Sequence, residues 1–116
     1  MYQRILVSTD GSTTSESALQ EAIRLANGQA QLRLVYVLEE IFPLDTEGYA
    51  FIDFATLQEA VRLTGERALA QAAEKVRQSG MMAETALLEA KGERIADVIV
   101  DEARQWASAV EIDDKY

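Results

Sequence analysis

The sequence has 116 residues, of which 48% are hydrophobic and 27% charged, with six glycines and one proline. These values are typical of one folded domain that buries a core without disulfides. The formal charge is −9 and the arginines are scattered, so no basic face is available for a nucleic acid backbone. The absence of cysteine and histidine excludes thiol nucleophiles, Ser-His-Asp triads and zinc sites built on those residues.

The sequence contains no repeats, low-complexity tracts or interdomain linkers, which predicts a single domain over residues 1–116. Its first segment lacks the basic start and long apolar stretch of a secretory signal. No segment reaches the length of a membrane span. We therefore expect a cytoplasmic protein that contacts neither membrane nor nucleic acid.

Short apolar runs alternate with helical patterns along the chain. The run at 4–9 is apolar at consecutive positions, which predicts a strand buried on both faces. A second apolar run at 31–38 and the segment 84–90, which carries Ala86, Leu87 and Leu88, predict two more strands. Helices are predicted over 13–26, 56–78 and 93–107, the first two opened by capping-box patterns at Thr13-x-x-Glu16 and Thr56-x-x-Glu59. The inward face of the last helix is expected to hold Ile95, Ala96, Ile99, Ala103 and Trp106. This alternation indicates an open parallel α/β sheet, a three-layer α/β/α architecture of the Rossmann-like kind.

Three features interrupt this pattern. The connection over 39–55 carries aromatic residues and can be a lid, an interface patch or a loop pinned to the body by its aromatics, namely Phe42, Tyr49, Phe51 and Phe54. Gly65 weakens the second helix by up to about 1 kcal/mol relative to alanine. Beyond the last helix, Val110 and Ile112 could form one further short strand.

Asp10 directly follows the first predicted strand, at the edge where ligands bind in such sheets. A carboxylate there can accept hydrogen bonds from a ribose hydroxyl or a base amino group, and Gly11 permits close backbone approach. The alternative is that Asp10 and Ser12 only cap the following helix.

The pattern as a whole resembles the universal stress protein family. The resemblance is carried by Arg4–Ser12, by Ser15, Ala18, Leu19 and Ala22, by Val35–Glu39, by Gly80, by Gly92–Ile99 and by Trp106-Ala107. It implies an adenine-nucleotide α-hydrolase-like fold, a five-stranded sheet with strand order 3-2-1-4-5, dimer formation and, in many members, ATP binding. It also implies that Asp10 contacts the adenosine part, that the backbone near Thr9 flanks it and that the main chain of Val37 meets the adenine edge.

One part of the family pattern is absent. The phosphates are normally held by a stretch of form G-x2-G-x9-G-[ST] after the fourth strand, whereas residues 107–116 contain no glycine. The sequence is therefore expected to be truncated relative to the family, without the glycine loop, the last helix and the last strand. We assign no phosphate-binding, metal-binding or catalytic residue and expect ATP binding to be weak or lost. No cofactor is required, although ATP or another adenine nucleotide could bind.

Without a fourth strand, the first strand becomes an apolar edge, which proteins normally cover. We therefore expect a homodimer or homo-oligomer that buries this strand or the aromatic connection against another copy.

These observations predict a cytoplasmic stress-response or regulatory protein that acts by binding and is not an enzyme. The alternative is a protein-interaction module that uses residues 42–54 to bind an unknown protein partner, with no nucleotide role. A third hypothesis is an enzyme of the wider adenine-nucleotide α-hydrolase group, whose loop after the first strand is richer in glycine than Ser8–Ser12.

Overall fold

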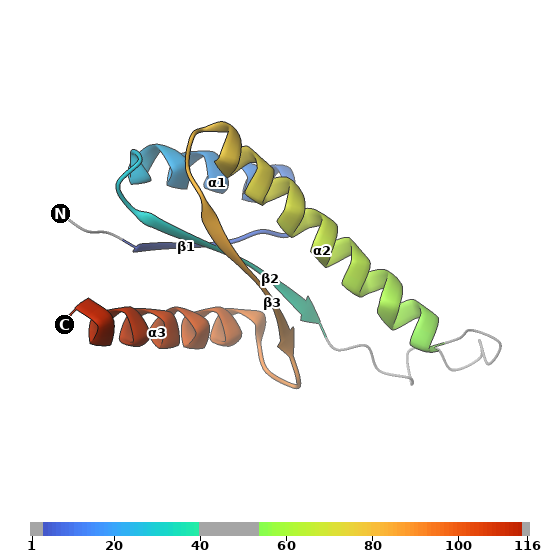
Figure 1. The fold of residues 1–116 in the computed structure, drawn as a ribbon. Helices are drawn as coiled ribbons and strands as arrows, with labels where there is room; N and C mark the ends of the chain where they lie inside the picture. Colours follow the sequence, from blue (N-terminus) through green and yellow to red (C-terminus); the bar gives the residue numbers. More distant parts are fainter. Residues whose placement is uncertain (1–3, 40–53, 115–116) are drawn as a thin grey trace.

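A computed structural model describes residues 4–39 and 54–114, with only the backbone for residues 54 and 107–114. Strands and helices alternate along this part of the chain (Figure 1). Their bounds are β1 (Arg4–Ser8), α1 (Thr13–Ala26), β2 (Gln31–Glu39), α2 (Phe54–Gln78), β3 (Ala83–Ala90) and α3 (Ile95–Asp114). The predicted alternation of strand and helix is confirmed.

The three described strands form one parallel sheet in the order β1-β2-β3, so β2 lies at its centre. Leu32 pairs with Ile5 on one side and with Ala83 on the other. Helices α1 and α2 cover one face of the sheet, and α3 lies on the opposite face (Figure 1). The three layers confirm the predicted α/β/α architecture, because a parallel sheet needs helices on both faces to bury its apolar strands.

Alternate residues of β2 supply the two halves of the core. Leu32 and Leu34 are fully buried and belong to the cluster that contains Leu19 of α1 and Val76 of α2. Val35 is also fully buried, and the alternation of side chains along a strand places it on the α3 face. Each such side chain contributes about 2 kcal/mol by leaving water.

Gly65 lies at the closest approach between α2 and the sheet. A Cβ atom at this position would lie 2.9 Å from Cδ1 of Leu87 and 2.9 Å from Cδ1 of Tyr36. Both distances are too short for real carbon contacts. The glycine that weakens the helix by its own propensity is therefore the residue that lets α2 pack against β2 and β3.

Helix α1 starts where the sequence predicts it, and its cap is Ser12 rather than the capping-box residue Thr13. Ser12 is the N-cap residue, and its hydroxyl accepts a hydrogen bond from the Ser15 amide at 3.2 Å. Thr13, expected to open a capping box, is already the first helical residue. Helix α2 likewise begins two residues before Thr56. Neither threonine is therefore a cap; at α1 that role belongs to Ser12, whose backbone is extended.

The sequence-based predictions for α3 need two corrections. Val110 and Ile112 do not form a strand, because α3 continues through them to Asp114. No glycine or proline interrupts the chain after Trp106, so nothing ends the helix there. Ile95 is 37% exposed, and Ala96 is also exposed rather than inward-facing. The other three predicted inward residues, Ile99, Ala103 and Trp106, are half-buried.

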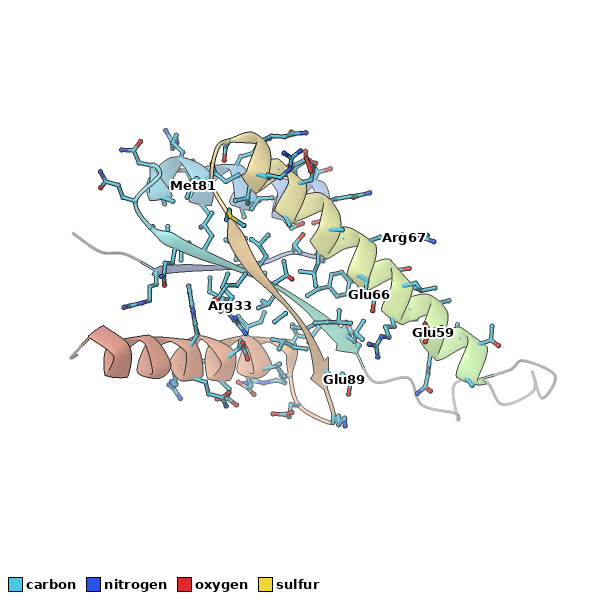
Figure 2. The ribbon with its side chains drawn as sticks, in the orientation of Figure 1. Arg33, Glu59, Glu66, Arg67, Met81 and Glu89 are labelled. Atoms are coloured by element: carbon cyan, nitrogen blue, oxygen red, sulfur yellow. The ribbon has the colours of Figure 1, made fainter. Side chains whose placement is uncertain are left out.

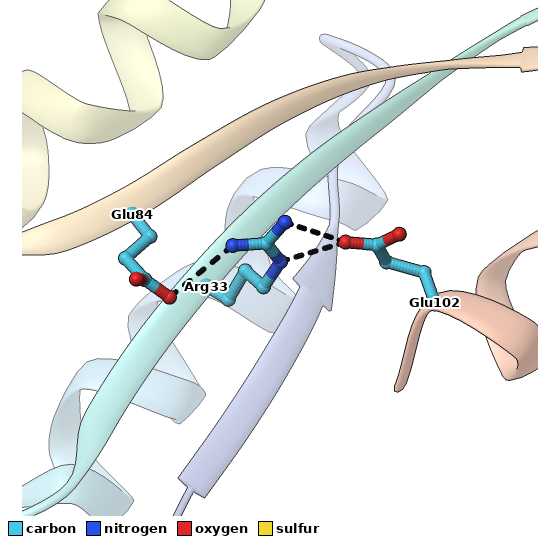
Figure 3. Close-up of polar contacts among 3 residues, drawn as sticks. All are labelled: Arg33, Glu84 and Glu102. Carbon is cyan, nitrogen blue, oxygen red and sulfur yellow. Dashed lines mark hydrogen bonds and ion pairs between the residues drawn. The ribbon is translucent and has the colours of Figure 1, made fainter. Parts of the chain in front are cut away.

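An arginine on β2 joins α3 to the sheet (Figure 3). Nε and Nη2 of Arg33 both donate to Oε2 of Glu102, at 2.8 and 2.5 Å. Nη1 of Arg33 donates to Oε2 of Glu84 on β3 at 3.2 Å. The Arg33 and Glu102 side chains are only 22% and 16% exposed, so this pair is partly shielded from water.

Candidate functional site

Thr9, Asp10 and Val37 lie together at the carboxyl edge of β1 and β2. The Thr9 amide donates to the Val35 carbonyl at 2.9 Å, which continues the β1–β2 ladder one residue past β1. In a parallel ladder, alternate residues turn both peptide groups toward the same neighbour. Val37 therefore directs its N–H and C=O toward the chain leaving β1, where Asp10 follows. The residues predicted for adenosine contact thus share one edge of the sheet.

The Asp10 carboxylate is exposed and is held by its own turn. Oδ1 accepts the Ser12 amide at 2.8 Å, and Gly11 between them has a φ of 81°, in the left-handed region that favours glycine. Hydrogen bonds from the Ser12 side chain and amide lower the pKa of Asp10 below its ordinary value. The ionised carboxylate keeps further lone pairs that a ligand donor can reach.

Ser15, which sequence reasoning did not assign to the site, connects the other residues. Its Oγ donates to the Ser12 carbonyl at 3.0 Å and lies 3.4 Å from the Asp10 amide and 3.5 Å from Oγ1 of Thr9. Thr9 and Ser15 are only 7% and 9% exposed. The only sequence signal for this arrangement is the Ser12-x-x-Ser15 spacing, because the contact to Thr9 depends on how the strand meets the helix.

A small cavity lies between the start of α1 and α2. It measures about 60 Å³ and is lined by Thr9 and Ser15 among others, with Lys75 and Glu16 joined by an ion pair at the same place. Ligand pockets measure roughly 300–1,000 Å³. A nucleoside at Asp10 would therefore lie against the outer edge of the turn rather than inside this cavity.

A larger cavity of about 390 Å³ lies at the carboxyl ends of β2 and β3, beside the first turns of α2. Its charged lining residues are Glu39, Glu59, Arg62, Glu89 and Lys91, of which Glu59 and Glu89 are labelled in Figure 2. Three carboxylates against two cations disfavour a phosphate group. None of the predicted site residues lines this cavity, so it does not replace the edge at Asp10 as the candidate nucleotide site.

Other predicted features lie outside this site. Phe42, Tyr49 and Phe51 fall outside the described residues, and Phe54 is described only as the first residue of α2. Over 4–39 and 54–114, no group of three or more acidic residues is arranged to hold a metal ion. No described helix has the length and apolar character that a bilayer crossing requires.

The fold and the candidate site define the class: an open parallel α/β protein with polar groups gathered at the carboxyl ends of its strands. The universal stress protein family model matches residues 1–110, and the chain belongs to that family. A protein from this family from Burkholderia pseudomallei is 33% identical, with a TM-score of 0.76, and the match covers 91% of this chain and 76% of that one. No curated protein gives a significant match.

Two more distant relatives show the same fold. The universal stress protein UspA from Lactobacillus plantarum is 23% identical with a TM-score of 0.69, covering 91% of this chain and 71% of its own. The universal stress protein from Archaeoglobus fulgidus in complex with dAMP is 24% identical with a TM-score of 0.61, covering 90% and 74%. The predicted family and fold class are confirmed.

Proposed function

We propose that this universal stress protein is a regulatory protein that binds an adenine nucleotide through its adenosine part, at the edge formed by Thr9, Asp10 and Val37. The observation that carries the proposal is the exposed Asp10 carboxylate, of lowered pKa, at the edge toward which the ladder turns the peptide groups of Val37. The carboxylate would accept a ribose hydroxyl, and the peptide groups of Val37 would pair with the adenine edge. The relative in complex with dAMP supports this choice of ligand.

The phosphates are expected to add little affinity to this chain. In this fold, phosphate is held by backbone amides of a glycine loop and a helix N-terminus. Residues 107–116 contain no glycine, and the chain carries a formal charge of −9. Adenosine, AMP and ATP should therefore bind with similar affinity.

We also propose that the protein acts by binding and not by catalysis, and that it works in the cytoplasm. A carboxylate whose pKa is lowered is a weak proton acceptor at neutral pH, which suits Asp10 to hydrogen bonding rather than to general base catalysis. The protein-interaction alternative uses residues 42–54, which lie outside the described residues except for the backbone of Phe54.

Calorimetric titration with adenosine, AMP and ATP tests the proposal. We expect comparable affinities for the three ligands in the wild-type chain and at least a tenfold loss in Asp10→Ala. Asp101→Ala is the matched control, because Asp101 is an exposed aspartate on α3, the helix on the opposite face of the sheet from α1. Absence of adenosine binding at millimolar concentration, or binding that depends strongly on the phosphates, would contradict the proposal.

A further inference from the structure

Ser15 is a buried polar side chain that contacts three parts of the turn after β1. It lies in the first turn of α1 and is 9% exposed. Its Oγ lies 3.0 Å from the Ser12 carbonyl, 3.4 Å from the Asp10 amide and 3.5 Å from Oγ1 of Thr9. The hydroxyl therefore touches the strand end, the residue that carries the carboxylate, and the helix cap.

The roles of these contacts follow from hydroxyl chemistry. A serine hydroxyl has one proton and two lone pairs. The proton goes to the Ser12 carbonyl, which leaves the lone pairs to accept from the Asp10 amide and from the Thr9 hydroxyl. An alanine at this position would leave all three groups without their contact to Oγ, whereas a threonine would keep the hydroxyl.

We propose that Ser15 is a positioning residue of the adenosine site: its hydroxyl fixes Thr9 and the Asp10 backbone against α1, so that the Asp10 carboxylate is presented at the edge beside Val37. This inference rests on the proposed function. Ser15 is only 9% exposed, so we assign it the positioning of Asp10 and no contact with the ligand.

The lengths of the contacts indicate what kind of effect to expect. The contacts to Asp10 and Thr9 lie near the upper limit for hydrogen bonds, so each is weak. The loss of Ser15 should therefore affect ligand affinity more than the stability of the free protein.

Three variants separate positioning from a purely structural role. Ser15→Ala removes the hydroxyl and Ser15→Thr restores it. Ser17→Ala makes the same change as Ser15→Ala at an exposed position two residues further along α1. In the ligand-free proteins, the carboxyl pKa of Asp10 is measured by NMR, and adenosine affinity is then measured by calorimetry.

Ser15→Ala should loosen the turn that holds the Ser12 amide against the Asp10 carboxylate. We therefore expect it to raise the pKa of Asp10 toward its ordinary value and to weaken adenosine binding about tenfold, which is about 1.4 kcal/mol. Ser15→Thr should restore both quantities, and Ser17→Ala should change neither. A folded Ser15→Ala protein with an unchanged Asp10 pKa and unchanged adenosine affinity would overturn the proposal. If wild-type protein does not bind adenosine, the proposed function fails, while the pKa comparison still decides whether Ser15 positions Asp10.

Discussion

Short polar side chains between Thr9 and Ser15 bond to one another where β1 passes into α1. The Ser12 hydroxyl caps the helix, and the Asp10 carboxylate accepts the Ser12 amide. The capping role that the sequence assigns to Ser12 is therefore present, whereas Asp10 holds the turn that precedes the helix. Local hydrogen bonding and ligand binding are compatible here, because a carboxylate has more lone pairs than the turn uses.

The lowered pKa of Asp10 makes stability depend on pH in acid. The folded pKa lies below the ordinary value of 3.8, because Ser12 donates hydrogen bonds to the ionised form. The stabilisation is complete above that value and is lost as the pH falls through the folded pKa. Urea unfolding from neutral pH down to about pH 3 should show a shallower loss of unfolding free energy in Asp10→Asn than in wild type. If the unfolding free energy fell equally steeply with pH in the two proteins, the turn would not stabilise the ionised Asp10 carboxylate.

Gly65→Ala should destabilise the protein, although alanine is the better helix former. Helix propensity favours alanine by up to about 1 kcal/mol. The added Cβ would lie 2.9 Å from both Leu87 and Tyr36, and overpacking of this kind costs roughly 1–3 kcal/mol. We expect thermal unfolding to occur about 5 °C lower. In a Leu87→Ala background the penalty should shrink, since one of the two contacts is removed; a rise in melting temperature on Gly65→Ala alone would refute this account.

At the scale of elements, a charged contact to β2 helps to hold α3 on the sheet. Half-buried apolar residues of α3 face the sheet, and the acidic side chain of Glu102 reaches Arg33 on β2 (Figure 3). The Arg33 guanidinium also reaches Glu84, which is 61% exposed. Arg33 therefore has one shielded and one exposed carboxylate partner, and the contributions of the two ion pairs to stability can be compared.

Glu102→Ala should weaken α3 docking, and Glu84→Ala should not. Removing the shielded partner leaves Arg33 partly buried without its main acceptor, which costs about 1–3 kcal/mol. Removing the exposed partner costs about 0–1 kcal/mol. Urea unfolding measures both costs, and hydrogen exchange should show faster exchange of α3 amides in Glu102→Ala alone. Equal losses of unfolding free energy in the two variants would show that shielding from water does not determine the strength of these ion pairs.

The order of the elements was predictable from local patterns, whereas details that depend on packing were not. Apolar runs and helical spacing identified the strands and helices because these signals lie within each segment. The end of α3 was wrong because β-branched Val110 and Ile112 favour a strand only when a neighbouring strand is available to pair with them. The close packing at Gly65 was not predictable, because it depends on residues distant in sequence. The contact between Ser15 and Thr9 was not predictable either, because it depends on how β1 meets α1.

At the scale of the whole molecule, β1 is the edge of the described sheet, and its surroundings limit how two copies can meet. Helix α2 packs on β2 and β3, and α1 packs on β1 beside α2. Helices pack about 8–10 Å apart, whereas strands lie about 4.8 Å apart. Helix α1 therefore extends over the outer side of β1. A second β1 paired to this edge would bring its own α1 into the same space.

We therefore expect that a dimer of this chain, if it forms, does not pair β1 with β1. Antiparallel pairing about Leu6 would place the two Leu6 Cα atoms about 5.5 Å apart, within disulfide range. The chain has no cysteine, so Leu6→Cys reports this contact alone. Oxidation should give no covalent dimer beyond the level seen with Ser8→Cys, which controls for chance collisions. Efficient crosslinking of Leu6→Cys would show that α1 leaves the edge accessible; the predicted dimer itself is tested by sedimentation.

The central position of β2 also has a consequence for the time course of folding. Both strand pairings of the described sheet include β2, and both join segments separated by a whole helix. Parallel pairings of this kind require a long loop to close before the strands make stabilising contacts. The entropy lost on loop closure makes folding slow. Because β2 is needed for both, its buried residues should belong to the folding nucleus. A newly synthesised chain would hold β1 and α1 as loosely ordered segments until β2 emerges, and β2 therefore sets the earliest moment at which this domain can begin to fold.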